Sequence, residues 1–160
     1  MTIRPIRELG DPVLRTPSDE VTSFDAWLAA LVRDLEETVD HPGRAGLAAP
    51  QIGVSVRAFS YNIDGVIGHL VNPVIVERSE EIQDGDEGCL SVPGIWAPTV
   101  RAMSCVAEGF DVHGEPLRLE GTGLMARCLQ HEVDHLDGKV FLDRLTGDAR
   151  KGALRALRSR

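Results

Sequence analysis

The feature that most limits how this chain folds is a pair of histidines four positions apart, His131 and His135, in the segment HEVDH. On an α-helix, residues i and i+4 lie on the same face, so both imidazoles can bind one metal ion. Glu132 follows the first histidine and is near enough to such an ion to take a proton from bound water. The alternative is a polar helix whose histidines are merely solvated. We expect a helix that carries two metal ligands.

A third ligand must come from another part of the chain, because catalytic metal sites usually have three protein ligands and one open position. After His135 there is no histidine and no glutamate, so the ligand is better sought upstream. Cys89 is the natural candidate, because it lies in a polar, glycine-rich segment that can bend close to a ligand. A Cys-His-His set suits Fe(II), Zn(II), Co(II) or Ni(II). Taken alone, Cys89 also fits a small buried hydrophobic residue.

The other two cysteines have different expected roles. Cys105 lies in an apolar segment and is expected in the core, whereas Cys128 is one turn before His131 and is placed to line a pocket. An odd number of cysteines without a secretory signal favours reduced thiols. The start of the chain lacks the apolar core of such a signal, and no run of 18 apolar residues exists, so we expect a cytoplasmic protein without a membrane span.

Length and charge limit the classes of function. With 160 residues, the chain is expected to form one catalytic domain over residues 1–160. A net charge of −8 argues against a protein that binds DNA with its whole surface. The exception is a basic run near the end of the chain, which is either a solvated helix face or a contact with an anionic partner such as ribosomal RNA. Its members are Arg150, Lys151, Arg155, Arg158 and Arg160.

Three helices and several short strands are expected. Ser23 can cap a helix that continues to about Asp40, with Trp27, Leu31 and Leu35 along one face. A second helix is expected from near residue 122 to Leu136, and a basic third helix at about 148–157. Strands are expected at 56–63, 70–77, 103–112 and 117–120, separated by turns at 64–65, 72–73, 94 and 113–114. The fold class is α+β, with antiparallel sheets packed around a central metal-binding helix, an N-terminal helix and a C-terminal helix.

Three segments together resemble the peptide deformylase family, whose signature is GxGxAAPQ, then EGCLS, then QHExDH. Here they are RAGLAAPQ at 44–51, EGCLS at 87–91 and QHEVDH at 130–135. The opening GDPVLR at 10–15 is also similar, so the resemblance extends from Gly10 to about Arg144. One departure is Arg44, which replaces the first glycine at a position bordering the substrate groove. It bears on substrate preference more than on activity.

The resemblance implies a metallohydrolase that acts on linear amides and removes the N-formyl group from the N-terminal methionine of nascent polypeptides. Its metal ligands are Cys89, His131 and His135, and its ion is commonly Fe(2+), with zinc, nickel or cobalt in purified samples. Metal-bound hydroxide attacks the formyl carbon, and Glu132 takes the water proton and delivers it to the departing amine. The products are formate and a free amino terminus.

The resemblance also implies roles for residues around the metal. The Gln51 amide and the Leu90 backbone N–H stabilise the oxyanion. Gly46 presents backbone groups to the peptide. Glu87 is expected among the substrate-binding residues, where it holds the loop or hydrogen-bonds a metal ligand. Cys128 and Leu124 are expected to line the methionine pocket, with ordinary core packing as the alternative, and Asp134 is expected to form a salt link, for example with Arg101.

Two other classes of function remain open. A peptidase that cuts internal peptide bonds is disfavoured by the missing downstream ligand and by Gln51. A structural metal module, or a catalytically inactive binding protein, would have no need of Glu132 or Gln51. The ribosome is a candidate partner through the basic C-terminal helix.

Overall fold

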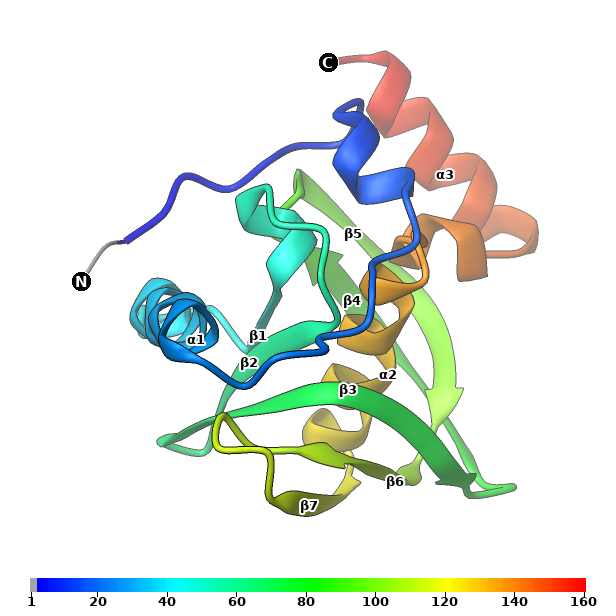
Figure 1. The fold of residues 1–160 in the computed structure, drawn as a ribbon. Helices are drawn as coiled ribbons and strands as arrows, with labels where there is room; N and C mark the ends of the chain where they lie inside the picture. Colours follow the sequence, from blue (N-terminus) through cyan, green and yellow to red (C-terminus); the bar gives the residue numbers. More distant parts are fainter. Residues whose placement is uncertain (1–2) are drawn as a thin grey trace.

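The computed structural model describes residues 3–160, and within this range the chain forms an α+β fold (Figure 1). Its helical elements, 3₁₀ turns included, are η1 (Pro12–Arg15), α1 (Ala26–Val39), η2 (Ala49–Ile52), α2 (Leu124–Leu136), η3 (Phe141–Arg144) and α3 (Gly147–Arg158). Its strands are β1 (Gly46–Ala48), β2 (Ala58–Ile63), β3 (Val66–Arg78), β4 (Ile82–Cys89), β5 (Val92–Ala102), β6 (Ser104–Phe110) and β7 (Pro116–Thr122).

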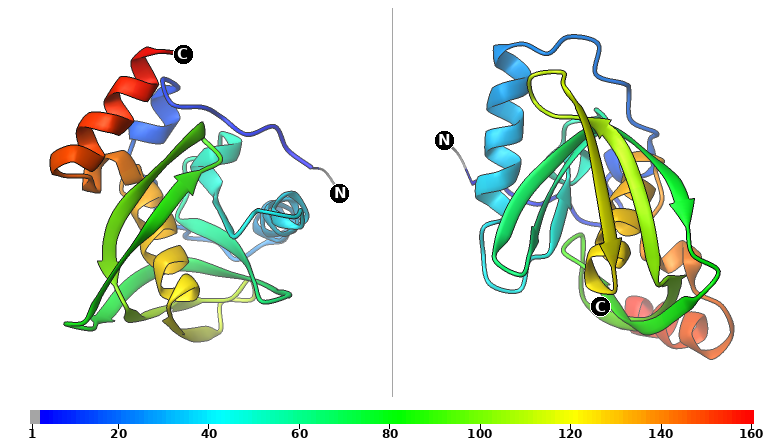
Figure 2. Two further views of the ribbon diagram at one scale, coloured as in Figure 1. Left: turned by 180° about the vertical axis from the view of Figure 1, so that it is seen from behind. Right: turned by 90° about the horizontal axis from the view of Figure 1, so that it is seen from below.

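The strands form two antiparallel sheets with α2 between them. The larger sheet has the order β1-β2-β3-β6-β7, and β4 and β5 form a separate two-stranded ribbon. Helix α2 contacts β1, β2, β3, β6 and β7 on one side and β5 on the other (Figure 1). Helices α1 and α3 lie at opposite sides of the molecule (Figure 2). The expected α+β architecture around a central helix is therefore confirmed.

Three apolar clusters hold these layers together. Helix α1 packs against β1, β2 and η2 through Leu28, Leu31 and Leu35. The second cluster joins α2 to the larger sheet, and it includes Leu129 and Phe59. The third lies beneath α3 and η3, against the start of β5. Because α2 borders the second cluster while β4–β5 covers its other face, the central helix is fixed from both sides.

Two expectations for the first helix were wrong in detail. Its N-cap is Asp25, whose carboxylate accepts a hydrogen bond from the Leu28 backbone N–H at 3.0 Å, and not Ser23. Trp27 is 56% exposed and lies off the buried face, which carries Leu28, Leu31 and Leu35. Trp27 precedes Leu31 by four residues, but each i, i+4 step on a helix is offset by about 40°, so Trp27 lies at the border of a stripe that begins at Leu28.

The β4–β5 hairpin is the main element that the sequence pattern did not predict. Its first strand contains Asp84, Gly85, Asp86 and Glu87, residues that strands usually avoid. Two expected turns also lie inside strands: residues 72–73 fall at a register shift of β3, and Gly94 has φ of 81° within β5. Pairing with β5 overrides local preference in this polar segment.

The short strand β1 was not predicted either, whereas the other helices and strands lie close to their expected places. The second helix spans the expected residues and the third begins one residue earlier than expected. The expected strands correspond to β2, β3, β6 and β7 with boundaries shifted by a few residues. None of the helices within residues 3–160 is long and apolar enough to cross a bilayer.

Candidate metal centre and active site

Three ligand atoms of the types that bind transition metals meet between α2 and the end of β4. The Sγ atom of Cys89 lies 3.3 Å from Nε2 of His135, which lies 3.1 Å from Nε2 of His131. All three atoms are within 4.8 Å of one another. The helical i, i+4 spacing places both imidazoles on one face, and β4 brings the thiol to them from the opposite side. The structure thus brings the three predicted ligands together.

Local backbone geometry positions Cys89. The register of β4 with β5 shifts between Gly88 and Cys89, so the strand leaves its regular path where the thiol points toward α2. The backbone N–H of Ser91 lies 3.4 Å from Sγ, and the Gln51 side-chain amide lies 3.6 Å from it. Both donors favour a thiolate.

The charges around these ligands shift their pKa values strongly. Burial alone would raise the pKa of the Cys89 thiol, but the imidazoles of His135 and His131 hold it well below its usual range. Burial would lower the pKa of His131, but the carboxylate of Glu132, the Cys89 sulfur and Glu87 together raise it well above its usual value. The lowered pKa of Cys89 favours the thiolate, which is the form of cysteine that binds a divalent cation.

A buried ionic network holds His131 from behind. Its Nδ1 atom lies 2.6 Å from Oε2 of Glu87, which leaves Nε2 facing the other ligands. Arg101 donates two hydrogen bonds to Glu87, at 3.0 and 2.7 Å, and Arg127 donates a third at 2.7 Å. Burial opposes ionisation of Glu87, but His131 and Arg101 hold its pKa well below the usual range. Glu87 thus remains an anion that orients the imidazole.

Asp134 extends this network toward the surface. It accepts hydrogen bonds from Arg101 at 2.7 Å and from Arg144 at 3.0 and 2.7 Å. The expected salt link between Asp134 and Arg101 is confirmed. Asp134 thus lies away from the three ligand atoms and anchors the arginine that binds Glu87.

Glu132 is a buried carboxylate next to the three ligand atoms. Its Oε2 atom is 3.9 Å from Nε2 of His131, and the residue is 3% exposed. Within residues 3–160, Oε1 has no hydrogen-bond partner. Burial raises the pKa of Glu132, and the imidazoles of His131 and His135 oppose that effect. A buried carboxyl oxygen without a partner, beside metal-binding atoms, is suited to proton transfer.

Gly46 lets the backbone of β1 come close to Glu132. A Cβ atom at Gly46 would lie 2.5 Å from Oε2 of Glu132 and 2.8 Å from Sγ of Cys128. Any side chain there would therefore displace one of these groups. The Cys128 thiol donates to the carbonyl of Ala45 at 3.4 Å, and burial raises its pKa, so it is a neutral lining residue. The expected burial of Cys105 in the core is also confirmed.

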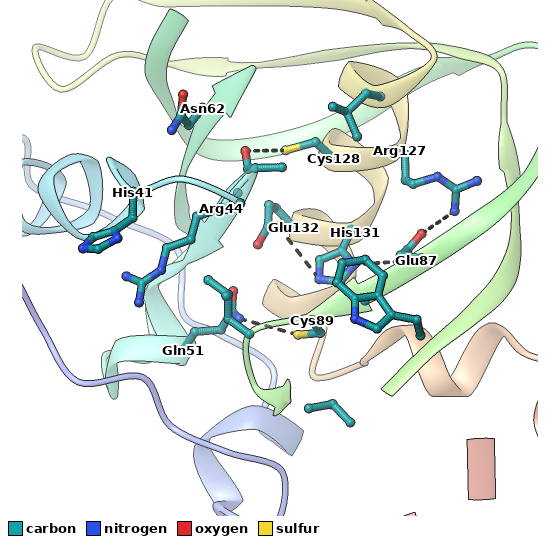
Figure 3. A pocket seen from close by; sticks show the side chains of 18 of the residues that line it. His41, Arg44, Gln51, Asn62, Glu87, Cys89, Arg127, Cys128, His131 and Glu132 are labelled. Atoms are coloured by element: carbon teal, nitrogen blue, oxygen red, sulfur yellow. Dashed lines mark hydrogen bonds and ion pairs between the residues drawn. The ribbon is translucent and has the colours of Figure 1, made fainter. Parts of the chain in front are cut away.

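The Gln51 side chain is fixed in one orientation. Its Oε1 atom accepts from the Ala48 backbone N–H at 2.9 Å, and its Nε2 donates to Ser91 Oγ at 3.1 Å. The residue lies in η2 and is 1% exposed. A rigid amide donor therefore faces the sulfur of Cys89 (Figure 3).

A pocket of about 830 Å³ opens over these residues (Figure 3). It contains nearly all of the predicted site residues, whereas His135 lies beneath it and is fully buried. The predicted residues in its lining are Gly46, Gln51, Glu87, Cys89, Leu90, Leu124, Cys128, His131 and Glu132. Its volume suits a small ligand or a few residues of an extended peptide.

Arg127 and Trp96 are among the residues of the pocket lining that were not predicted. Arg127 is 7% exposed and ion-paired to Glu87, and Trp96 is 68% exposed at the pocket wall. A charged residue next to Cys128 on an otherwise inward-facing helix was a usable signal for Arg127. Trp96 gave no such signal, because its place at the pocket depends on the unpredicted β4–β5 pairing, which puts it opposite Gly88.

These residues fit a bound divalent ion. A thiolate and two imidazoles form a donor set for Fe(II) or Zn(II), and their atoms already converge. The second nitrogen of His131 is held by a carboxylate, as is common for metal-binding histidines. Glu132, whose Oε1 has no hydrogen-bond partner within residues 3–160, lies next to the same ligand atoms.

Comparisons with known proteins agree with this arrangement. The model of the polypeptide deformylase family matches residues 3–151. A peptide deformylase of Acidothermus cellulolyticus is 60% identical over 158 residues, which cover 99% of this chain and 87% of that protein. The chain is also 46% identical to peptide deformylase 1 of Corynebacterium efficiens, over 99% of this chain and 96% of the relative.

Solved structures show the same fold. The crystal structure of peptide deformylase from Thermus thermophilus superposes with a TM-score of 0.91 at 42% identity, covering 98% of this chain and 94% of that chain. A peptide deformylase from Legionella pneumophila gives a TM-score of 0.90 at 41% identity, covering 99% and 95%. A third, from Synechococcus elongatus in complex with actinonin, gives 0.89 at 34% identity, covering 97% and 87%.

Proposed function

The chain belongs to the polypeptide deformylase family, the enzymes that remove the N-formyl group from nascent polypeptides, and on that premise we propose how its own residues carry out the reaction. The proposal rests on one observation above all. Cys89, His131 and His135 converge beside the unpartnered oxygen of Glu132, in a pocket open to a peptide. The whole of residues 1–160 is taken as one catalytic domain.

Cys89, His131 and His135 are proposed to hold one divalent ion, Fe(2+) in the native enzyme and zinc, nickel or cobalt as substitutes. When bound, such an ion supplies Lewis acidity and lowers the pKa of water from 15.7 to roughly 7. Glu87 keeps the ring of His131 oriented through its 2.6 Å contact with Nδ1. Its four short contacts leave it little capacity to bind substrate, so its proposed role is to position a ligand.

Glu132 is the proposed general base and acid. Its unpartnered Oε1 can accept a proton from the attacking water, and the same carboxyl can deliver it to the departing amine. Burial raises the pKa of the Glu132 carboxyl toward neutral pH, and this favours both the uptake and the release of the proton.

Gln51 and Leu90 are the proposed oxyanion donors. The Gln51 amide is already fixed by Ala48 and Ser91, so little reorganisation is required when negative charge develops on the formyl oxygen. Leu90 follows the Cys89 ligand directly and lines the same pocket. Its backbone N–H is proposed as the second donor.

The peptide is proposed to bind in extended form beside Gly46, whose missing Cβ leaves the strand backbone accessible. Leu124 and Cys128, on α2 above the ligands, would line the site of the methionine side chain. A neutral, buried thiol and a leucine provide the apolar surroundings that a thioether side chain prefers.

The decisive experiment measures formate release from formyl-Met-Ala-Ser by protein loaded anaerobically with Fe(II). In Glu132→Gln, which keeps the shape of the side chain, kcat is expected to fall by about 10²–10⁴-fold. Bound metal and the thermal unfolding midpoint should remain as in the parent. If the folded, metal-loaded parent released no formate, the proposal would be wrong.

The third helix is proposed to bring the enzyme to the ribosome in the cytoplasm. Arg150, Lys151, Arg155, Arg158 and Arg160 are all exposed on or next to it. RNA binding through cations weakens steeply with salt. Co-sedimentation with ribosomes should therefore decline when Arg155 and Arg158 are changed to glutamate.

A further inference from the structure

Within residues 3–160, one arginine at the pocket mouth is not neutralised by an ion pair. Two arginines line the pocket, and Arg127 is paired with Glu87 at 2.7 Å. Arg44 makes no ion pair with any carboxylate in residues 3–160. This difference makes Arg44 the arginine available to a charged ligand.

In the part of the chain that the structure describes, the Arg44 guanidinium makes a hydrogen bond through one nitrogen and none through the others. Its Nη1 atom donates to the backbone carbonyl of Thr38, near the end of α1, at 2.7 Å. A guanidinium carries five N–H donors, so this bond leaves others for a ligand. The side chain extends away from Glu132 toward His41, at the polar end of the pocket (Figure 3). The anchor reduces the entropy that Arg44 loses on binding.

The direction of β1 indicates which part of a peptide reaches Arg44. Gly46 lies next to Glu132, whereas Gly43 and Pro42, on the far side of Arg44, are exposed. The chain from Arg44 to Gly46 therefore runs inward, toward the reacting groups. A peptide whose N-terminal formyl group lies beside Glu132 runs outward from its N-terminus to its C-terminus. It therefore lies antiparallel to this segment.

The edge of the sheet is available for such a peptide. Among residues 3–160, β1 is the edge strand of its sheet and pairs with β2 alone, and residues 43–46 line the pocket. Opposite residues in an antiparallel pair lie on the same face of the sheet. With the formylmethionine beside Gly46, the second residue lies beside Ala45 and the third beside Arg44.

From this geometry we propose that Arg44 selects formylated peptides with an acidic side chain at the third residue. This inference rests on the proposed function and specifies its substrate class. Asp40 and Asp64 also line the mouth and are exposed, and they oppose Arg44 by repelling an acid. Their carboxylates remain hydrated, whereas the anchored, partly buried guanidinium is the group in register with the third side chain.

The test is a charge scan at that residue, with formyl-Met-Ala-Xaa-Gly-amide in which Xaa is Glu, Gln or Lys. The amide removes the terminal carboxylate, which would otherwise add a second negative charge. For the parent enzyme, kcat/KM for Glu is expected to exceed that for Gln by about threefold to fivefold, the range of a partly exposed ion pair. The preference should shrink in 0.5 M salt as a consequence of screening, a condition at which the Debye length is about 4 Å.

Arg44→Gln should abolish the Glu preference while formyl-Met-Ala-Gln-Gly-amide is still cleaved. Arg33→Gln is the matched control, because it removes the same charge from an exposed arginine on α1. This variant should keep the preference for Glu. A Glu-to-Gln ratio of one in the parent, a preference for Lys, or an unchanged ratio in Arg44→Gln would overturn the inference. Failure of the parent to cleave any of the three peptides would instead overturn the proposed function.

Discussion

Helices α1 and α2 have similar lengths, 14 and 13 residues, but they bury different kinds of side chain. Helix α1 buries one stripe of leucine and valine and leaves its other face in water. Helix α2 buries every residue from Ala126 to Leu136, including Arg127, Glu132 and Asp134. One helix is an ordinary amphipathic element, and the other is the core of the molecule.

The difference shows how a helix can be stabilised in two ways. Burial of apolar area holds α1 in place and requires no exact partner. Arg127 and Asp134 of α2 each have a partner from another element, because a buried charge without one is costly. Arg101 on β5 provides that partner for both Asp134 on α2 and Glu87 on β4. Perturbing each helix should therefore have a different signature.

The largest loss of stability is expected when the shared arginine, Arg101, is removed. Arg101→Met should lower the free energy of unfolding by about 3–5 kcal/mol, because it leaves two buried carboxylates undercompensated. Arg118→Met, which removes an exposed arginine paired with surface glutamates, is the control and should change stability little. Urea denaturation of both variants measures this. Equal effects would mean that the network around α2 contributes no more than a surface pair.

Creating a cavity beneath α1 tests how much the burial of apolar side chains stabilises that helix. Leu35 is fully buried, so Leu35→Ala should cost about 2–5 kcal/mol. The loss should appear in denaturant midpoints while kcat of the folded enzyme stays near the parent value, because Leu35 lies outside the pocket lining. Trp27→Ala, at a side chain that is 56% exposed, should be much milder. If Trp27→Ala destabilised the protein as much as Leu35→Ala, the assignment of the buried face would be wrong.

The smallest expected effect concerns the start of α1. Asp25→Ala should cost about 1 kcal/mol through loss of the hydrogen bond to the Leu28 N–H. Ser23→Ala should leave the thermal midpoint unchanged, since Ser23 lies before the cap. The reverse order would restore Ser23 as the capping residue.

The sequence predicted the elements that local patterns determine and missed those that depend on distant pairing. The i, i+4 histidines and the apolar stripe of α1 are local patterns, so both helices were located with small errors at the cap and at Trp27. The strands with alternating or β-branched residues were also found. Strands β1, β4 and β5 were not predicted. Residues 84–88 of β4 have low strand preference and are stabilised by pairing with β5.

The site was predictable where chemistry restricts the residue type. His131 and His135 were visible from their spacing, Cys89 was the favoured third ligand, and the resemblance to a known family completed the set. The support around them was only partly visible. The pair of Arg101 and Asp134 was expected, but Arg127 and the double role of Arg101 depend on which side chains share one buried space. A single sequence contains no direct signal of that arrangement.

The edge of β1 also bears on how the protein avoids aggregation. Exposed strand edges can template pairing with other chains and so promote aggregation. Here the free edge of β1 is three residues long and opens toward a pocket whose other wall includes Gly88 and Trp96. The pocket has a volume of about 830 Å³, which suits a few residues of one extended chain. An edge of three residues offers few backbone groups to another copy of the protein, while it still presents them to a single bound strand.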